Sequence, residues 1–97
     1  MNQLTVDGEL TIFNAGEQKT HLLNFLNSGS DLEINLSQVD EIDTAGLQLL
    51  ILIKRLAAQQ TKTLRYVMHS KEVLNILELT NLISAFGDQV VLVHKEV

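Results

Sequence analysis

The residues of this chain with the clearest chemical potential lie between residues 40 and 46. Asp40, Glu41 and Asp43 place three carboxylates on one short segment, and Thr44 adds a hydroxyl directly after them. Asp and Thr cap helices through a side-chain oxygen, and a run of strong helix formers follows. We therefore expect Thr44 at the start of a helix, at the positive end of the helix dipole.

A hydroxyl in that position is a candidate phosphate acceptor. Backbone N–H groups at a helix start favour anions, so phosphorylation of Thr44 should leave the fold intact. The phosphate would add roughly −1.5 to −2 charge beside Asp43 and Glu41 and abolish complementarity with an acid-facing or apolar partner. Gly46 would let another backbone approach closely, and a larger residue there should block docking at a modest folding cost. The other interpretation of Asp43 and Thr44 is a plain helix cap, and the residue types leave both open.

Other chemistry has little support in the sequence. His21, His69 and His94 lie far apart, without acidic residues at metal-ligand spacing, and the absence of cysteine excludes thiol catalysis and zinc–thiolate sites. None of the patterns HExxH, GxSxG, GxxxxGK[ST] or GxGxxG occurs. The three carboxylates have no nearby histidine or lysine that would complete a hydrolytic site. We predict that the protein is not an enzyme and uses no metal or cofactor.

Length and composition indicate one small domain over residues 1–97, with 45% apolar residues. The N-terminus lacks a basic region followed by an apolar stretch, and no run approaches the roughly 18 apolar residues of a membrane span. Together with the lack of cysteine, this predicts a soluble, cytoplasmic protein without membrane insertion.

Charge is unevenly distributed along the chain, whose net charge is −5. Residues 1–43 hold eight acids and one base, whereas residues 44–97 hold four acids and six bases. The acidic balance argues against nucleic acid, whose phosphates attract basic surfaces. It fits either a merely solubilising surface or a partner with a basic face.

The first half of the chain is predicted to contain three strands and a helix. Alternating residues on either side of Asp7-Gly8 predict two short antiparallel strands joined by a two-residue hairpin turn. Asn14 and Glu17 resemble a capping box that opens a helix. Apolar alternation then predicts a strand over 31–36, followed by the acidic loop that ends at Thr44.

The second half repeats the alternation of helix and strand. A central helix from Thr44 to about Gln59, a strand over 63–68, a short helix capped by Ser70 and a last strand over 90–93 are expected, with room for a helix near 80–86. The order β-β-α-β-α-β-α-β implies βαβ crossovers. We predict an α/β fold, with a mixed, mostly parallel sheet of four to five strands and helices on one face.

The central helix is apolar over an unusually wide arc of roughly 260°, more than a helix resting on a sheet requires. Neighbouring helices on both sides would explain this width. Alternatively, the part of the arc near Leu47 and Leu49 docks a partner.

These features resemble a STAS domain over nearly all of the chain. The resemblance rests on Gly8-Glu9-Leu10, on the strand Leu32–Leu36 and above all on Asp43-Thr44-Ala45-Gly46-Leu47 with Leu50 one turn on. The last segment matches the family signature Asp-[Ser/Thr]-x-Gly-Leu in a strand-loop-helix context.

The resemblance implies a bacterial signalling module similar to anti-sigma-factor antagonists. In such proteins a kinase-type anti-sigma factor phosphorylates the hydroxyl, the unmodified form binds that kinase, and a phosphatase resets the system. Carried over, Thr44 is the phosphate acceptor, and the partner-binding residues are Asp43, Thr44, Ala45, Gly46, Leu47 and Thr11.

The resemblance leaves two other functions open. Thr44 replaces the commoner serine, and Thr11 stands where sigma-regulating members usually carry Asp. Similar Asp-Thr-x-Gly-Leu proteins are constitutive accessory subunits that bind the ATPase of a bacterial ABC lipid-transport system. A chemotaxis-linked adaptor is the third candidate.

Overall fold

The computed structural model of this chain describes residues 1–81. In chain order, the elements are β1 (Asn2–Leu10), α1 (Ala15–Leu26), β2 (Asp31–Ile42), α2 (Thr44–Gln59), β3 (Thr63–Val67) and α3 (Lys71–Thr80). The predicted strand over 90–93 lies outside the described residues, and the option of a helix near 80–86 extends beyond them.

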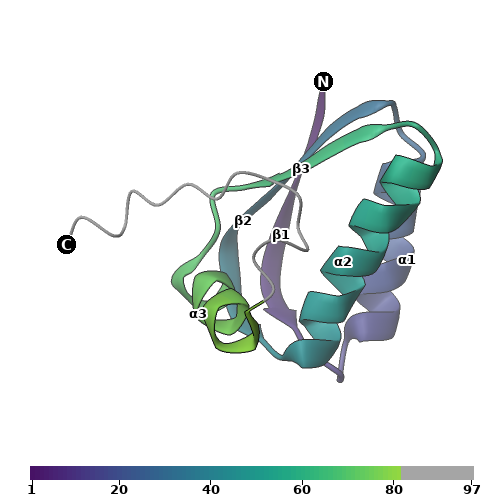
Figure 1. The fold of residues 1–97 in the computed structure, drawn as a ribbon. Coiled ribbons are helices and arrows are strands. Elements are labelled where there is room, and N and C mark those ends of the chain that lie inside the picture. The colour runs from purple at the N-terminus through teal and green to yellow at the C-terminus, as the bar shows by residue number, and fades with distance from the viewer. Residues whose placement is uncertain (82–97) are drawn as a thin grey trace.

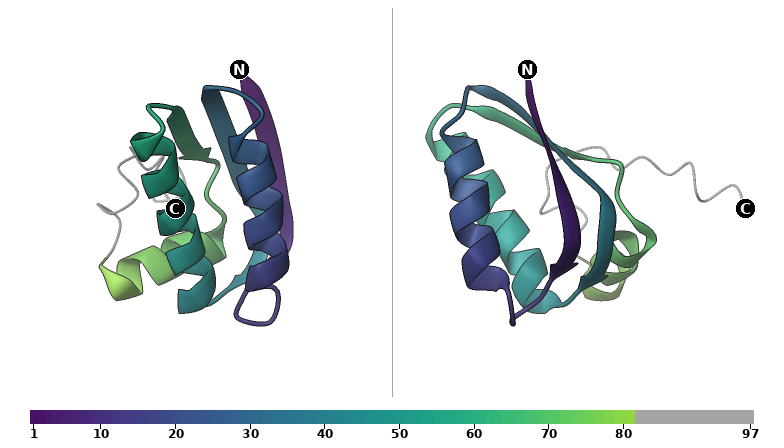
Figure 2. Two further views of the ribbon diagram at one scale, coloured as in Figure 1. Left: turned by 90° about the vertical axis from the view of Figure 1, so that its right-hand side faces the viewer. Right: turned by 180° about the vertical axis from the view of Figure 1, so that it is seen from behind.

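The described strands form one parallel sheet in the order β1-β2-β3. Helices α1 and α2 run side by side along one face of this sheet, and α3 lies near the end where β2 finishes (Figures 1 and 2). The opposite face is polar, and there Arg65 of β3 pairs with Glu33 of β2 at 3.4 Å. The α/β class and the parallel pairing are confirmed, although three strands are described where four to five were predicted.

The predicted hairpin at Asp7-Gly8 is wrong, because β1 continues through it as one strand. Gly8 has φ +89° and lies where the register with β2 shifts, so that Gly8 is opposite Val39 but Glu9 is opposite Glu41. The glycine therefore forms a bulge and not a turn. The partner of β1 is β2, which follows only after α1, and no local pattern could reveal that pairing.

The predicted acidic loop before Thr44 is also largely wrong, because β2 extends to Ile42. The same register shift skips Asp40, so the simple alternation of 31–36 is broken while the strand continues. Val39 is buried and Ile42 packs against the core, which holds this extension in the sheet. Only Asp43 separates β2 from α2.

Helix α2 has the predicted bounds, and it contacts α1, α3 and all three strands. These contacts account for the wide apolar arc of α2, in agreement with the explanation that neighbouring helices flank it. Leu47 and Leu49 are only 1% and 6% exposed, whereas Leu52 is an exposed large apolar side chain on this helix.

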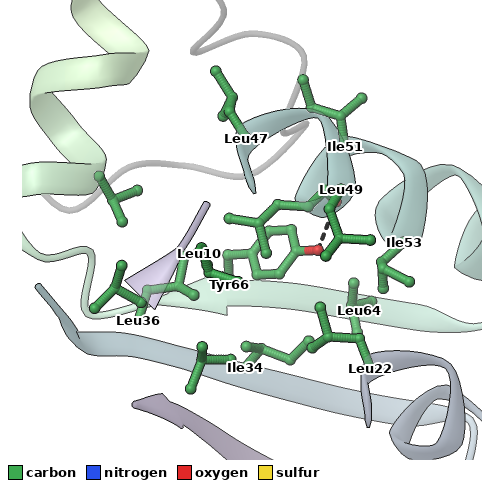
Figure 3. Close-up of a cluster of buried hydrophobic side chains, with 14 of the residues drawn as sticks. Leu10, Leu22, Ile34, Leu36, Leu47, Leu49, Ile51, Ile53, Leu64 and Tyr66 are labelled. Carbon is green, nitrogen blue, oxygen red and sulfur yellow. Dashed lines mark hydrogen bonds between the residues drawn. The ribbon is translucent and has the colours of Figure 1, made fainter. Parts of the chain in front are cut away.

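The core lies between α2 and the sheet, and Tyr66 of β3 stands at its centre (Figure 3). Its hydroxyl donates a 2.6 Å hydrogen bond to the Leu50 carbonyl of α2, so the ring fills the core while its polar tip is satisfied. Helix α3 contributes Val73 and Leu77 to the same cluster. The oxygen of Ser70 accepts from the Val73 N–H, which confirms the predicted cap.

Candidate protein-docking site

Asp43 joins the end of β1 to the start of α2. Its Oδ1 accepts from the Gly46 N–H at 3.0 Å, as expected of a helix cap, and its Oδ2 accepts from the Ile12 N–H at 2.9 Å. The Asp43 N–H in turn donates to the Leu10 carbonyl at 3.2 Å. The Ile12 and Gly46 N–H groups stabilise the carboxylate and lower the pKa of Asp43 below its ordinary value. The carboxylate thus has two backbone partners within the protein.

Gly46 is buried where the first turn of α2 meets the end of β1. A Cβ atom at Gly46 would lie 1.9 Å from the Leu10 carbonyl oxygen and 2.6 Å from the Leu10 carbonyl carbon. The close approach that a glycine permits is therefore made by the protein's own backbone. A larger residue at position 46 would clash with the Leu10 backbone, so the expectation of a modest folding cost is wrong. No local sequence pattern indicates this contact.

Thr44 is the first residue of α2 and is exposed. Its hydroxyl makes no hydrogen bond within residues 1–81, which leaves it accessible at the positive end of the helix. Ala45 beside it is partly exposed, whereas Leu47 is buried in the core. Leu47 therefore anchors the first turn of α2 in the core, while Thr44 and Ala45 lie on the outer side of that turn.

The loop between β1 and α1 is held beside this helix start by its own polar groups. The buried Thr11 donates its hydroxyl to the Glu9 carboxylate and accepts from the Phe13 N–H at 3.3 Å. Asn14 accepts from the Thr11 N–H at 2.9 Å and donates to the Glu9 carbonyl at 2.6 Å. The predicted capping box is wrong, because the Asn14 side chain folds this loop and does not cap α1.

This loop presents two large apolar side chains that the sequence interpretation missed. Ile12 is 65% exposed and Phe13 is 91% exposed. Because the Ile12 N–H binds Asp43, the loop lies next to the start of α2. The sequence pattern places Ile12 in the second strand of the predicted hairpin and gives Phe13 no role. The available signal was an adjacent apolar pair that continues neither a strand nor a helix pattern.

A groove of about 510 Å³ runs along α2 from Ala45 to Arg55. Its walls include Ala45, Gln48, Leu49, Ile51, Leu52 and Arg55. We call the exposed loop pair together with the outer side chains of the first three turns of α2 the α2 docking surface. It comprises Ile12, Phe13, Thr44, Ala45, Gln48 and Leu52.

A family model described as "Mlab, STAS domain" matches residues 2–92 of the 97-residue chain. The chain belongs to the STAS domain family. The predicted resemblance is thereby confirmed, and it identifies the protein as a signalling or accessory interaction module. No curated protein matches the chain.

Metal-binding clusters and membrane-spanning helices are both absent from the described part of this STAS domain. Within residues 1–81, no group of three or more His, Asp or Glu side chains could hold a metal ion. In the same part of the chain, no helix combines the length and the apolar character needed to span a membrane. STAS domains are generally non-enzymatic binding modules, and the described surface agrees with that role.

Proposed function

We propose that this STAS domain binds a partner protein through the α2 docking surface and that phosphorylation of Thr44 releases the partner. The observation that carries the proposal is the 91% exposure of Phe13 on a tightly bonded loop beside an exposed threonine. Exposed aromatic side chains are frequent anchors of protein interfaces.

The loop is organised before any partner arrives, which favours tight binding. The N–H groups of Thr11, Ile12 and Phe13 all have side-chain acceptors. A loop whose backbone is already fixed loses little conformational entropy on association, so more of the apolar contact energy of Ile12 and Phe13 appears as affinity.

A phosphate on Thr44 would add negative charge in the middle of this surface. Asp43 is adjacent and, with its lowered pKa, is fully ionised at neutral pH. The additional charge of roughly −1.5 to −2 would make it unfavourable to remove water from around Ile12 and Phe13. It would also repel any acidic group of the partner. The partner implied by the family resemblance is a kinase-type anti-sigma factor or related signalling ATPase, with a phosphatase for reversal.

The second candidate is a constitutive accessory subunit of an ABC lipid-transport system, and Thr11 favours it. Where sigma-regulating relatives usually carry Asp, this chain has a buried Thr11, 3% exposed and bonded to Glu9. The position therefore offers no free carboxylate to a kinase. The matching family model is, moreover, described as Mlab and not as an anti-sigma-factor antagonist.

Affinity purification from native cytosol distinguishes these functions, with the wild type, Thr44→Glu and Phe13→Ala as baits. A kinase-like ATPase retained by the wild type but not by Thr44→Glu, with phosphate found on Thr44, would support the switch. An ABC ATPase retained equally by both, without phosphate, would support the fixed subunit. Under either function Phe13→Ala should weaken binding about 30-fold, the effect of losing an interface anchor.

Matched controls separate binding from folding. Thr20→Glu introduces the same change on an exposed threonine of α1, and Met68→Ala truncates another exposed apolar residue. Both should bind like the wild type, and all variants should melt within a few degrees of it. If Thr44→Glu unfolds the domain, the hydroxyl is structural and the switch fails. If Phe13→Ala binds normally, the α2 docking surface is not the interface.

A further inference from the structure

A second groove is lined by the end of β2 and by α3. These two segments meet at the lower end of the domain in Figure 1. It measures about 300 Å³ and shares no residue with the α2 docking surface. Its walls include Asp40, Glu41 and Ile42 of β2 and Glu72, Ile76 and Leu79 of α3. We call it the β2–α3 groove.

The apolar part of this groove lies largely on one face of α3. Glu72, Ile76 and Leu79 are spaced four and three residues apart, which places them on one face of the helix. Ile42 and Ile76 are partly buried against the core, whereas Leu79 is 85% exposed. The groove thus has an apolar floor that continues into a leucine standing in solvent.

The rim of the groove is acidic. Asp40, Glu41 and Glu72 are all exposed, and none forms an ion pair within residues 1–81. Apolar surface surrounded by uncompensated carboxylates is complementary to an apolar surface surrounded by cations.

We propose that the β2–α3 groove binds a basic amphipathic helix of a partner protein. Leucine or isoleucine side chains of that helix lie on Ile42, Ile76 and Leu79, and its Lys or Arg side chains pair with the carboxylates at the rim. The acidic rim repels an anionic membrane surface. A second copy is disfavoured too, because a two-fold symmetric contact would bring the same carboxylates together.

This proposal is independent of the phosphorylation of Thr44 and of the identity of the principal partner. The probe is a synthetic peptide of Leu and Lys at amphipathic-helix spacing, added to the isotope-labelled full chain and followed by amide NMR. We expect shifts in residues 40–42 and 72–79, an increase in peptide helicity, and weaker binding as salt is raised. A peptide with Glu in place of Lys should produce none of these shifts.

Charge reversal at matched sites tests where the peptide binds. Glu72→Lys should weaken peptide binding roughly three- to tenfold, because an attractive pair becomes a repulsive one. Asp31→Lys makes the same change of charge at the opposite end of β2 and should leave binding unchanged. Leu79→Lys should also weaken it, with no loss of stability because the side chain is exposed. Phe13→Ala should bind the peptide like the wild type.

Three results would overturn the proposal. The first is the absence of shifts in the groove of the wild type. The second is equal weakening by Asp31→Lys and Glu72→Lys, which would mean that only net charge is sensed. The third is a dimeric mass in solution that Leu79→Lys converts to a monomeric mass, which would make a second copy the occupant.

Discussion

Replacing Gly46 by alanine tests the packing between α2 and the end of β1. In an isolated helix this change is favourable by about 1 kcal/mol, because alanine has the higher helix propensity. In the folded domain, however, the new Cβ would lie 1.9 Å from the Leu10 carbonyl oxygen. That atom belongs to the backbone, so a rotation of the Leu10 side chain cannot relieve the contact. The first turn of α2 must move away from β1.

The size of the effect follows from what that movement disturbs. Overpacking of a tight site costs about 1–3 kcal/mol or more. The bonds from Asp43 to Leu10 and Ile12 span the same junction, and each contributes about 0.5–1.5 kcal/mol. After subtracting the gain in propensity, we expect Gly46→Ala to lower the free energy of unfolding by about 2–4 kcal/mol.

Urea denaturation followed by circular dichroism measures this difference, and Gly16→Ala is the matched control. Gly16 also lies in a helix, but a Cβ there would meet nothing within 4 Å. Gly16→Ala should therefore stabilise the domain by about 0.5 kcal/mol. For a slope near 2 kcal/mol/M, Gly46→Ala should shift the midpoint down by about 1–2 M urea. A Gly46→Ala variant as stable as Gly16→Ala would refute the assigned contact.

Two other variants test the site and the core. Asp43→Asn should be less stable than the wild type at neutral pH. The folded-state pKa of Asp43 lies below its ordinary value of 3.8, so the ionised carboxylate stabilises the fold at pH values above 3.8. This contribution disappears as the pH falls through the lowered pKa. Unfolding free energies at neutral pH and at a pH below the lowered pKa check this, and a difference independent of pH would contradict it. Tyr66→Phe removes the buried hydrogen bond to Leu50 and should cost about 1 kcal/mol in urea unfolding, whereas unchanged stability would mean that the bond contributes nothing.

Local signals in the sequence were sufficient for the central and third helices. Asp43 and Ser70 cap α2 and α3 as predicted, because a cap depends on a side chain and on N–H groups only a few residues away. The first half of the strand before α2, over 31–36, and the family signature from Asp43 to Leu47 were also recognisable, because both are patterns of neighbouring residues. The same cap places Thr44 at the start of the helix.

Tertiary structure alone decided how distant segments meet. The Asp7-Gly8 pair fits a hairpin locally, but β1 pairs with β2 after α1, so the glycine forms a bulge. Asn14 fits a capping box locally, but its amide finds better-placed partners in the preceding loop. In both cases the local pattern was satisfied by more than one structure, and long-range packing selected among them.

The composition of the docking surface has the same origin. The sequence signature places Gly46 on the predicted docking surface and gives Phe13 no role, whereas in the structure Gly46 is covered and Phe13 is exposed. Gly46 is buried because the end of β1 crosses the start of α2, and Phe13 is exposed because the Ile12 N–H ties its loop to Asp43. Exposure is a property of the assembled elements, since a side chain is buried only when segments far along the chain cover it.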